Sequence, residues 1–494
     1  MLMELKKFYL IAALMAAPAA LFAQSNHYIS VTGAGSNDGS SWDNAMPFST
    51  LCENIDTYEN GDVFYFKEGT YLVPTPLKVT KKGYTFIGGF ASELTGESNE
   101  TPEYPTETPT VFSGDVNRDG KASEGDAECL LSFKTDTKNG DETKKVVLKG
   151  LELTCAYSQT SPGDNADARG ALHLDNCGWV EVDNCRFHGN VGEDLTGEDP
   201  KQVGGMAFTS HRSLSVFNDC EFTDNKATSR GGAIKLTSDN KEKGKTTFNR
   251  CLIARNTIKN DLGSAICMQH GAYLQIVNST VTGNAGPDGE AAIFATGTDD
   301  SHLRYVYIVN STVAGNGAAP QIEMTSDANL FVANSIIVSD GDAAALSVST
   351  TKESVSGGMN IVGSDAAGTL TWGDTDDAQA GNNYAAVFGE NVLGDNVVIE
   401  PLAETGKYTF AALAEAIAGW GIEADVNVDQ TGKPRADGST PGAYAKTTPS
   451  GIQGVEAVEE AGDGAYYTLQ GVKLGARPTA TGIYIHNGKK VIIR

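Results

Sequence analysis

Hydrophobic and polar residues alternate through the middle of this chain in a phrase that returns about every 24 to 35 residues. The phrase reads apolar-x-Asn/Asp-Cys/Ser-x-apolar-x-x-Asn, with small departures between copies. Its six copies span residues 182–190, 217–225, 248–256, 276–284, 308–316 and 332–340. Short alternating runs are typical of β-strands, and a repeat of this length is one coil of a solenoid, which buries its apolar face against neighbouring coils. We therefore predict a stack of β-strand coils.

A second strand of each coil follows a run of small residues such as Gly-Gly-Ala-Ile (231–234). Alternation along a strand sends successive side chains to opposite faces. It predicts that residues 172, 207, 234, 266 and 293 point inward, and that the following residues point outward: His173, Phe208, Lys235, Cys267 and Phe294, with Glu323 next.

The third position of the phrase lies where a coil must bend. A short amide side chain tolerates the left-handed backbone conformation and can hydrogen-bond the next coil. We interpret the asparagines at this position as a structural ladder rather than as ligands: Asn184, Asn278, Asn310 and Asn334.

Three of the eight cysteines, Cys185, Cys220 and Cys251, share the next position, which serine fills in the later copies. Neighbouring coils lie roughly 4.8 Å apart, a spacing compatible with a disulfide and equally with a column of buried free thiols. We expect a packing ladder of small residues, with disulfides as the alternative.

The segment FTDNKATSRGGAI (222–234) resembles the repeat of the polymorphic outer-membrane protein family. The opening YISVTGAGSNDGSSWDNA (28–45), the segment 87–117 and the closing segment 416–445 resemble exported β-helix proteins of the choice-of-anchor type. In the last of these, a phrase ends the solenoid with Asp429, Gly432, Pro434, Arg435 and residues 442–444. This resemblance implies an all-β fold, a right-handed single-stranded parallel β-helix with a small C-terminal β module. Such scaffolds host lyases, hydrolases and adhesins alike.

Five segments follow along the chain. Residues 1–23 read as a signal peptide, with Lys6 and Lys7 before an apolar run and a cut after Ala23; an uncleaved anchor helix is the alternative. Residues 24–145 form an N-terminal cap and first coils with a polar insertion at 91–145, and residues 146–445 form the repeats and closing segment. A linker (446–465) precedes a C-terminal module (466–494).

That C-terminal module is similar to the sorting modules of type IX-secreted surface proteins, through Gly482, Ile483, Tyr484, Gly488, Lys489 and Lys490. The similarity implies contact with a secretion machinery, and a small β cap without that role is the alternative. We expect an exported protein, outside the cell or associated with its surface or outer membrane, with no transmembrane span in the mature chain.

The net charge of the chain limits the kinds of molecule that it can bind. The chain carries 37 Lys and Arg against 63 Asp and Glu, a net charge of −26 with neutral histidine. Such a surface repels nucleic acid, which excludes a nucleic-acid partner, and it suits divalent cations.

One acidic stretch has the spacing of a calcium loop. Counted from Asp115, oxygen-bearing side chains stand at loop positions 1, 3, 5, 9 and 12, with glycine at position 6. The stretch resembles dockerin loops, which implies a Ca²⁺ site at Asp115, Asn117, Asp119 and Asp126. The alternative is a solvated acidic turn.

No nucleophile, phosphate-loop or zinc motif occurs in the chain. A lyase or hydrolase needs charged side chains side by side, but His173, Lys235 and Glu323 fall on separated coils. Outward Phe208 and Phe294 could stack on sugar rings or be covered by loops. We expect a non-catalytic adhesin or glycan-binding protein whose candidate ligand residues are His173, Phe208, Lys235 and Phe294. Its partner would be an extracellular glycan or a host or neighbouring surface protein. The alternatives are a polysaccharide lyase or glycoside hydrolase acting on acidic polysaccharide, and a structural surface-layer component.

Overall fold

The computed structural model describes two compact units of the chain. In the first it describes residues 24–445, apart from 160–168, 194–202, 239–243, 261, 287–289, 297–303, 327, 350–353, 366–367, 369, 380, 390–408 and 423. In the second it describes residues 465–493, apart from 469–472, 480–481 and 487–488. The signal peptide expected at 1–23 and almost all of the linker expected at 446–465 lie outside these residues.

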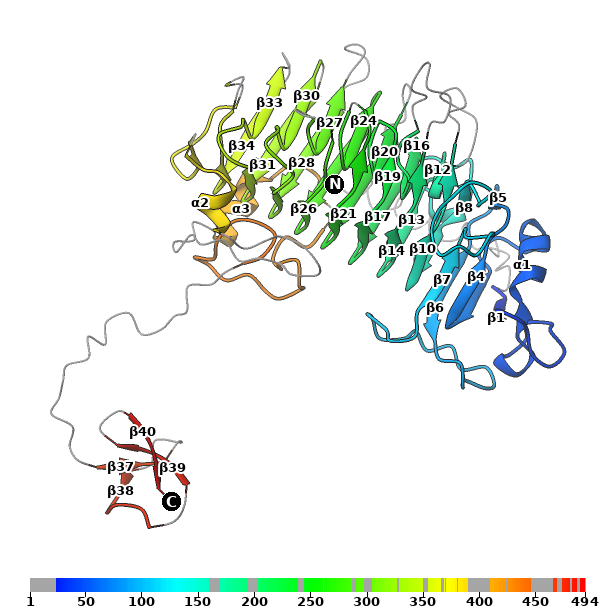
Figure 1. The fold of residues 1–494 in the computed structure, drawn as a ribbon, viewed down its shortest axis with the longest axis horizontal. Coiled ribbons are helices and arrows are strands. Elements are labelled where there is room, and N and C mark those ends of the chain that lie inside the picture. The colour runs from blue at the N-terminus through cyan, green and yellow to red at the C-terminus, as the bar shows by residue number, and fades with distance from the viewer. Residues whose placement is uncertain are drawn as a thin grey trace, which may run out of the picture. The chain divides into compact units, whose positions relative to one another are not determined.

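Four sheets built from parallel strand pairs make up most of the first unit (Figure 1). Sheet A has twelve strands: β2 (Met46–Pro47), β1 (Asn26–Ser30), β3 (Val63–Lys67), β6 (Thr85–Phe90), β9 (Val146–Lys149), β13 (Val180–Asp183), β17 (Leu214–Asn218), β21 (Lys245–Asn249), β25 (Tyr273–Val277), β28 (Arg304–Val309), β31 (Ala328–Ala333) and β34 (Ser354–Gly358). Sheet B has eleven: β4 (Gly69–Leu72), β7 (Thr110–Ser113), β10 (Leu151–Thr154), β14 (Arg186–His188), β18 (Glu221–Thr223), β22 (Leu252–Ala254), β26 (Thr280–Thr282), β29 (Thr312–Ala314), β32 (Ile336–Val338), β35 (Ile361–Val362) and β36 (Asp377–Ala378).

Sheet C has nine strands: β5 (Leu77–Thr80), β8 (Cys129–Lys134), β12 (Gly170–Asp175), β16 (Phe208–His211), β20 (Ile234–Thr237), β24 (Ile266–Gln269), β27 (Ile293–Thr296), β30 (Ile322–Thr325) and β33 (Leu346–Ser349). The small sheet D lies between B and C along the chain, with β11 (Tyr157–Ser158), β15 (Val191–Gly192), β19 (Lys226–Ala227) and β23 (Thr257–Ile258). β7 and β8 lie within the stretch expected as a polar insertion and add strands to sheets B and C.

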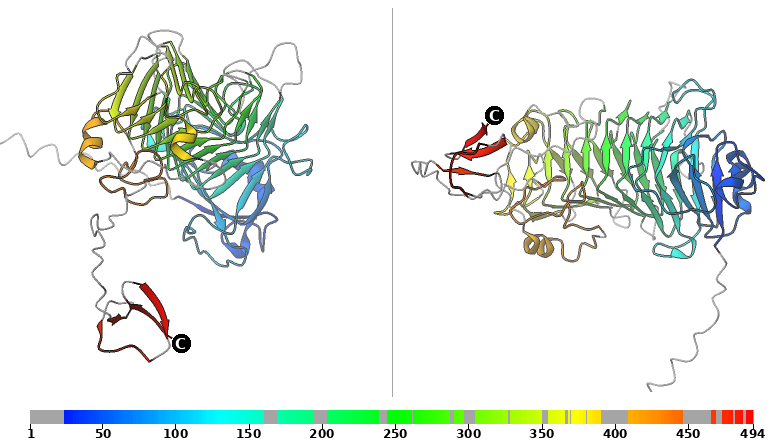
Figure 2. Two further views of the ribbon diagram at one scale, coloured as in Figure 1. Left: turned by 60° about the vertical axis from the view of Figure 1, so that its left-hand side comes forward. Right: turned by 90° about the horizontal axis from the view of Figure 1, so that it is seen from below.

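One coil runs from sheet A through B and D to C, and then returns to A one strand further along (Figure 2). In sheets A and B, residues at equivalent positions of the repeat phrase pair with one another. In sheet A, Val182 pairs with Phe217, and Phe217 pairs with Phe248; in sheet B, Phe187 pairs with Phe222. These side chains are fully buried and form part of one continuous apolar core. The chain is therefore an all-β parallel β-helix.

The bend from sheet A to sheet B uses one residue per coil in the left-handed conformation. Its φ lies between 48° and 61° at Gly150, Asn184, Asp219, Arg250, Asn278, Asn310 and Asn334. Asn310 donates through Nδ2 to Oδ1 of Asn278 at 3.0 Å, and Asn334 donates to Asn310 at 2.8 Å. Towards the N-terminus this corner ladder continues through the residue before the bend: Asn249, Asn218 and Asp183. The expected inclusion of the Asn184 side chain is therefore wrong, because the ladder changes position between β21 and β25.

A second ladder, formed by the asparagine that ends each of the first five phrases, lies buried just after the strands of sheet B. Each Oδ1 accepts both the backbone N–H and an Nδ2–H of the rung before it, as Asn284 does for Asn256 at 3.0 and 2.9 Å. The series runs Asn190, Asn225, Asn256, Asn284, Asn316 and Gln321. We call it the inner ladder.

The cysteines after the first bend form a column of small side chains. Cys185, Cys220 and Cys251 are free thiols that are at most 1% exposed. The column continues through Ser279, Ser311 and Ser335, whose hydroxyls each donate to two carbonyl groups, one of them two residues before.

Three α-helices lie in the described part of the first unit, besides three short 3-10 helices. Phe48 and Leu51 of α1 (Phe48–Asn54) belong to the main apolar core. α2 (Tyr384–Phe388) packs on Ala314, Ile336 and Val338 of sheet B, and α3 (Phe410–Ala416) packs on the outside of sheet A. None of the described helices is long and apolar enough to span a membrane.

The second unit is a small antiparallel sheet, unlike the parallel sheets of the coils. β39 (Gly482–His486) pairs with both β37 (Tyr466–Tyr467) and β40 (Lys489–Ile493), and β38 (Lys473–Leu474) pairs with β37. The fold therefore includes the small C-terminal β module.

Candidate functional site

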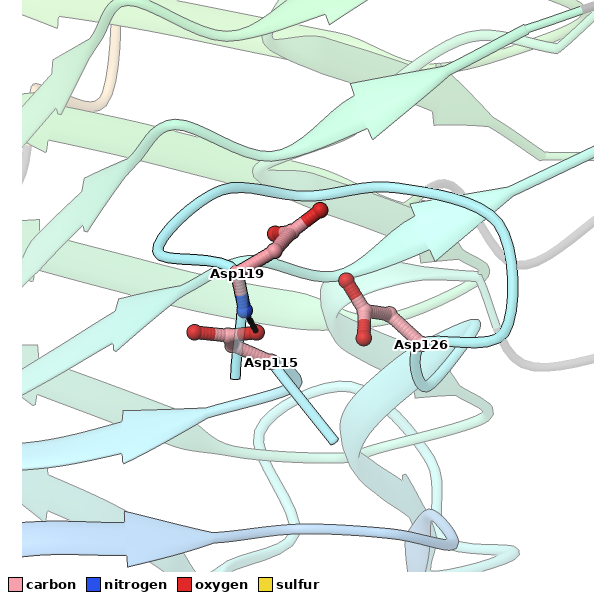
Figure 3. Close-up of side chains that lie close together, drawn as sticks. All are labelled: Asp115, Asp119 and Asp126. Atoms are coloured by element: carbon pink, nitrogen blue, oxygen red, sulfur yellow. Dashed lines mark hydrogen bonds between the residues drawn. The ribbon is translucent and has the colours of Figure 1, made fainter. Parts of the chain in front are cut away.

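Three carboxylates converge in the loop that joins β7 to β8. Asp115, Asp119 and Asp126 each place an oxygen within 4.8 Å of the others (Figure 3). Gly120 at the sixth loop position has φ +81°, a conformation that glycine adopts without strain. The loop thus brings together three of the four residues that the calcium spacing singled out.

The interior of this loop is organised by its own hydrogen bonds. Asp115 accepts the N–H groups of Asp119 and Gly120, both at 3.0 Å. Asp126 accepts the N–H groups of Val116 at 2.9 Å and Ser123 at 2.9 Å. Asn117, the fourth predicted ligand, accepts the N–H of Asp119 through Oδ1 at 2.9 Å. Carboxylate and amide oxygens are the donors that Ca²⁺ prefers, so this donor set fits calcium.

A buried thiol lies beside the loop. Burial raises the pKa of Cys155, and the charges of Asp115 and Asp126 raise it further. Because its pKa is raised, this thiol stays protonated and adds no negative charge to the acidic loop.

One strand of sheet C, β16, is shifted by one residue from its expected register, so its outward side chains differ from the expected ones. Gly205 pairs with Gly231 rather than Gly232, because its N–H donates to the Gly231 carbonyl. Phe208 is consequently opposite Ile234, fully buried, with its ring 4.7 Å from that of Phe217. The expected outward position of Phe208 is wrong, because a shift of one residue reverses every side chain of a strand. Thr209 takes its place.

Phe294 lies in the outward column but is only 6% exposed. A side chain added to Gly263 would come 3.2 Å from the Phe294 Cβ, so the turn at Gly263 lies against it. The ring is covered, and the interpretation of Phe294 as an exposed platform for sugar rings is wrong.

The outward column of sheet C runs over successive coils and is polar except at the buried Cys267 and Phe294: Lys78, Ser132, His173, Thr209, Lys235, Cys267, Phe294, Glu323 and Ser347. His173 Nδ1 lies 2.7 Å from Thr209 Oγ1. Burial lowers the pKa of His173 to about 4, which keeps the imidazole neutral. In the neighbouring column, Lys134 pairs with Asp175 at 2.7 Å.

One pair of carboxylates emerges that the sequence did not single out. Burial raises the pKa of Glu323, and the charge of Glu290 raises it further. Glu290 accepts the N–H of Leu262 at 3.1 Å. It lies in the turn before β27, where no repeat position marks it, so the phrase alignment carried no signal for it.

Comparison with known proteins supports the architecture. Residues 169–384 match the family model described as a right handed beta helix region. The fold is a right-handed parallel β-helix. The match begins just before β12 and leaves out the acidic loop. A search of the curated proteins finds no match to the sequence.

Proposed function

We propose that this right-handed β-helix protein binds an extracellular glycan along the outward face of sheet C, without catalysis. The carrying observation is that hydrogen-bonding side chains pair between adjacent coils in two outward columns of sheet C: His173 with Thr209 in one, and His211 with Thr237 and Thr296 with Thr325 in the other. Coils repeat about every 4.8 Å, so each such row offers donors and acceptors spaced by the coil repeat. A chain-like polar ligand suits such a row.

The described surface favours polar over apolar recognition. Of its large hydrophobic side chains, only Val31, Val116 and Phe410 are classed as exposed, and none belongs to sheet C. Contiguous exposed apolar patches mark many protein–protein and membrane contacts. Sugar hydroxyls, which need hydrogen-bond partners, match the sheet C face better.

The position of the acids supports binding rather than catalysis. Within the described part of sheet C, the outward carboxylates are Asp175 on β12 and Glu323 on β30. Five strand spacings separate them, about 24 Å. Paired carboxylates of glycosidases stand about 5 to 10 Å apart, and Asp175 is neutralised by Lys134.

Glycoside hydrolysis is the second candidate, and one observation favours it. Burial and the charge of Glu290 both raise the pKa of Glu323, and a glycosidase needs one carboxyl of raised pKa to protonate the leaving oxygen and a second carboxylate as base or nucleophile.

One experiment separates these functions. Full-length protein is applied to a glycan array, and bound glycans are assayed for new reducing ends and unsaturated products. Lys235→Ala and Thr209→Ala are expected to weaken binding about tenfold, the loss of one or two hydrogen bonds. Lys226→Ala, which removes an exposed charge from sheet D, serves as the control. Product formation that Glu323→Gln abolishes would replace binding by hydrolysis. Absence of any bound glycan would leave the structural surface-layer role.

We also propose that the protein is exported and held at the cell surface. The support is the signal-like leader at 1–23 and the separate C-terminal unit, whose sequence resembles type IX sorting modules. N-terminal sequencing of the protein from the cell surface should begin at Gln24, and deletion of 466–494 should prevent its arrival there. An intact Met1 on the mature protein would contradict the export proposal.

A further inference from the structure

A non-repeating segment after α3 crosses the corner between sheets A and B. Residues 425–443, which we call the strap, lie along the outside of the coils (orange in Figures 1 and 2). Hydrogen bonds join the strap to four consecutive coils, at Cys251, at Asn278 and Thr280, at Asn310 and Thr312, and at Asn334.

The strap completes the corner ladder. Asn278 and Asn310 are fully buried, and each donates one Nδ2–H to the rung before it. The strap accepts from the same two side chains: the Asp425 carbonyl lies 2.6 Å from Asn278 Nδ2, and the Val426 carbonyl lies 2.7 Å from Asn310 Nδ2. A buried amide N–H that loses its hydrogen-bond partner is destabilising, so these coils depend on the strap.

One strap side chain connects two coils directly. Gln430 donates through Nε2 to the Cys251 carbonyl at 3.1 Å, and its Oε1 accepts from Thr280 Oγ1 at 2.5 Å. Cys251 precedes β22 and Thr280 begins β26, so the two bonds bridge adjacent rungs of sheet B.

Arg435 holds the strap in its folded form. The side chain is 2% exposed. Its Nε donates to the Val428 carbonyl at 3.0 Å, and Nη2 donates to the carbonyls of Gly442 and Ala443 at 2.5 and 3.1 Å. Nη2 also reaches the Asn310 carbonyl at 3.4 Å. One guanidinium therefore ties both ends of the strap to the corner.

The outer surface of sheet A changes from polar to apolar where the closing segment covers the coils. One outward column of sheet A is polar on the earlier coils, with Lys149, Asp183, Asn218 and Asn249. On the later coils it is apolar, with Val277, Val309 and Ala333. Those three residues pack against Leu413, Trp420 and Ile422, in and just after α3.

In a solenoid each coil contacts only its neighbours, so coils at an end can separate one at a time. We infer that the strap is a lock that joins the four coils from β21/β22 to β31/β32 into one cooperative unit. This inference stands independently of any ligand.

Hydrogen–deuterium exchange of the full-length protein tests the lock. Gln430→Ala removes two hydrogen bonds, and Arg435→Lys removes the fork that joins the strap ends. In both variants we expect amide exchange about tenfold faster, and by the same factor, in β21, β25, β28 and β31. Exchange in β9 and β13 should stay unchanged.

Lys433→Ala is the matched control, because it alters an exposed side chain within the strap. Acceleration confined to the coil nearest each substitution would overturn the inference, as would equal acceleration in β9. If Arg435→Lys fails to fold, the milder Gln430→Ala still decides between these outcomes.

Discussion

The backbone N–H of Cys185 donates to the sulfur of Cys220, one coil further on, with 3.4 Å between nitrogen and sulfur. Cys251 donates in the same way to the Ser279 hydroxyl at 2.9 Å. In this column the cysteine sulfur and the serine hydroxyl oxygen therefore both accept a hydrogen bond from the backbone of the coil before. Cys220→Ser should change the free energy of unfolding by about 1 kcal/mol or less, whereas Cys220→Val leaves the Cys185 N–H unpaired and should cost about 1–3 kcal/mol.

Chemical denaturation of the two variants beside the wild type measures both values. Valine is β-branched and larger than cysteine, so Cys220→Ala, which also lacks the acceptor but adds no volume, is the control for overpacking. A valine variant as stable as the serine variant would show that the column is only packing.

The inner ladder should be far more sensitive to substitution than the bend next to it. Asn256 uses its whole side chain, accepting from Asn225 and donating to Asn284 and to the Phe222 carbonyl. Asn256→Ala should cost about 3–5 kcal/mol, since it leaves several buried groups unpaired. Asn184 has φ 50° and lies outside both ladders, so Asn184→Gly should be nearly neutral. Thermal unfolding of the pair compares them, and equal losses would contradict the assignment of the ladder.

Acid should destabilise the protein through His173. Burial lowers its folded pKa to about 4 from an ordinary value of 6.5. A depressed folded pKa means that the contribution is fully present above pH 6.5 and is lost as the pH falls towards 4, because only the unfolded chain takes up the proton. The loss over this window is at most about 3 kcal/mol.

Urea unfolding at pH 7.5, 6 and 4.5 measures this slope. His173→Gln keeps a hydrogen-bonding group opposite Thr209 but cannot titrate. Its stability should therefore fall less steeply between pH 6.5 and 4 than that of the wild type. Parallel curves for the two proteins would rule out His173 as the source.

Calcium binding by the loop 115–126 is a proposal that titration can decide. Isothermal titration should give a calcium-dependent heat that Asp115→Ala and Asp119→Ala abolish, because each removes a converging carboxylate. Glu124→Ala removes the same charge from an exposed position in the loop and should retain the heat. No heat with the wild type, or equal loss in all three variants, would reduce the loop to a solvated acidic turn.

Periodicity alone predicted the coils and two of the three large sheets in register. The inward positions of Val182 and Phe217, and of Phe187 and Phe222, follow from alternation within the phrase because no residue is inserted there. In sheet C the small-residue run offers two glycines in succession, Gly204 and Gly205, and either could align with the next coil. The two alignments place Phe208 on opposite faces of the sheet, and one sequence does not distinguish them.

The contacts between the strap and the coils could not be predicted from periodicity. Arg435 and Gln430 belong to no repeat, and the carbonyls of Asn310 and Cys251 that they contact in the coils lie more than a hundred residues away in the chain. The inner ladder, in contrast, was visible as the last asparagine of each phrase. Its meaning depended on seeing that consecutive copies stack with their amides in line.

The inner ladder also determines where a whole coil can be removed from the stack or added to it. Every rung from Asn225 to Asn284 joins its neighbours through the same atoms, so excising or duplicating one whole coil rejoins identical amides. Gln321 ends the series by donating to the carbonyls of Gly317 and Ala319 in its own coil and to the Ser339 hydroxyl of the next coil. The middle of the stack is therefore the place where the number of coils can change while the contacts at both ends stay the same.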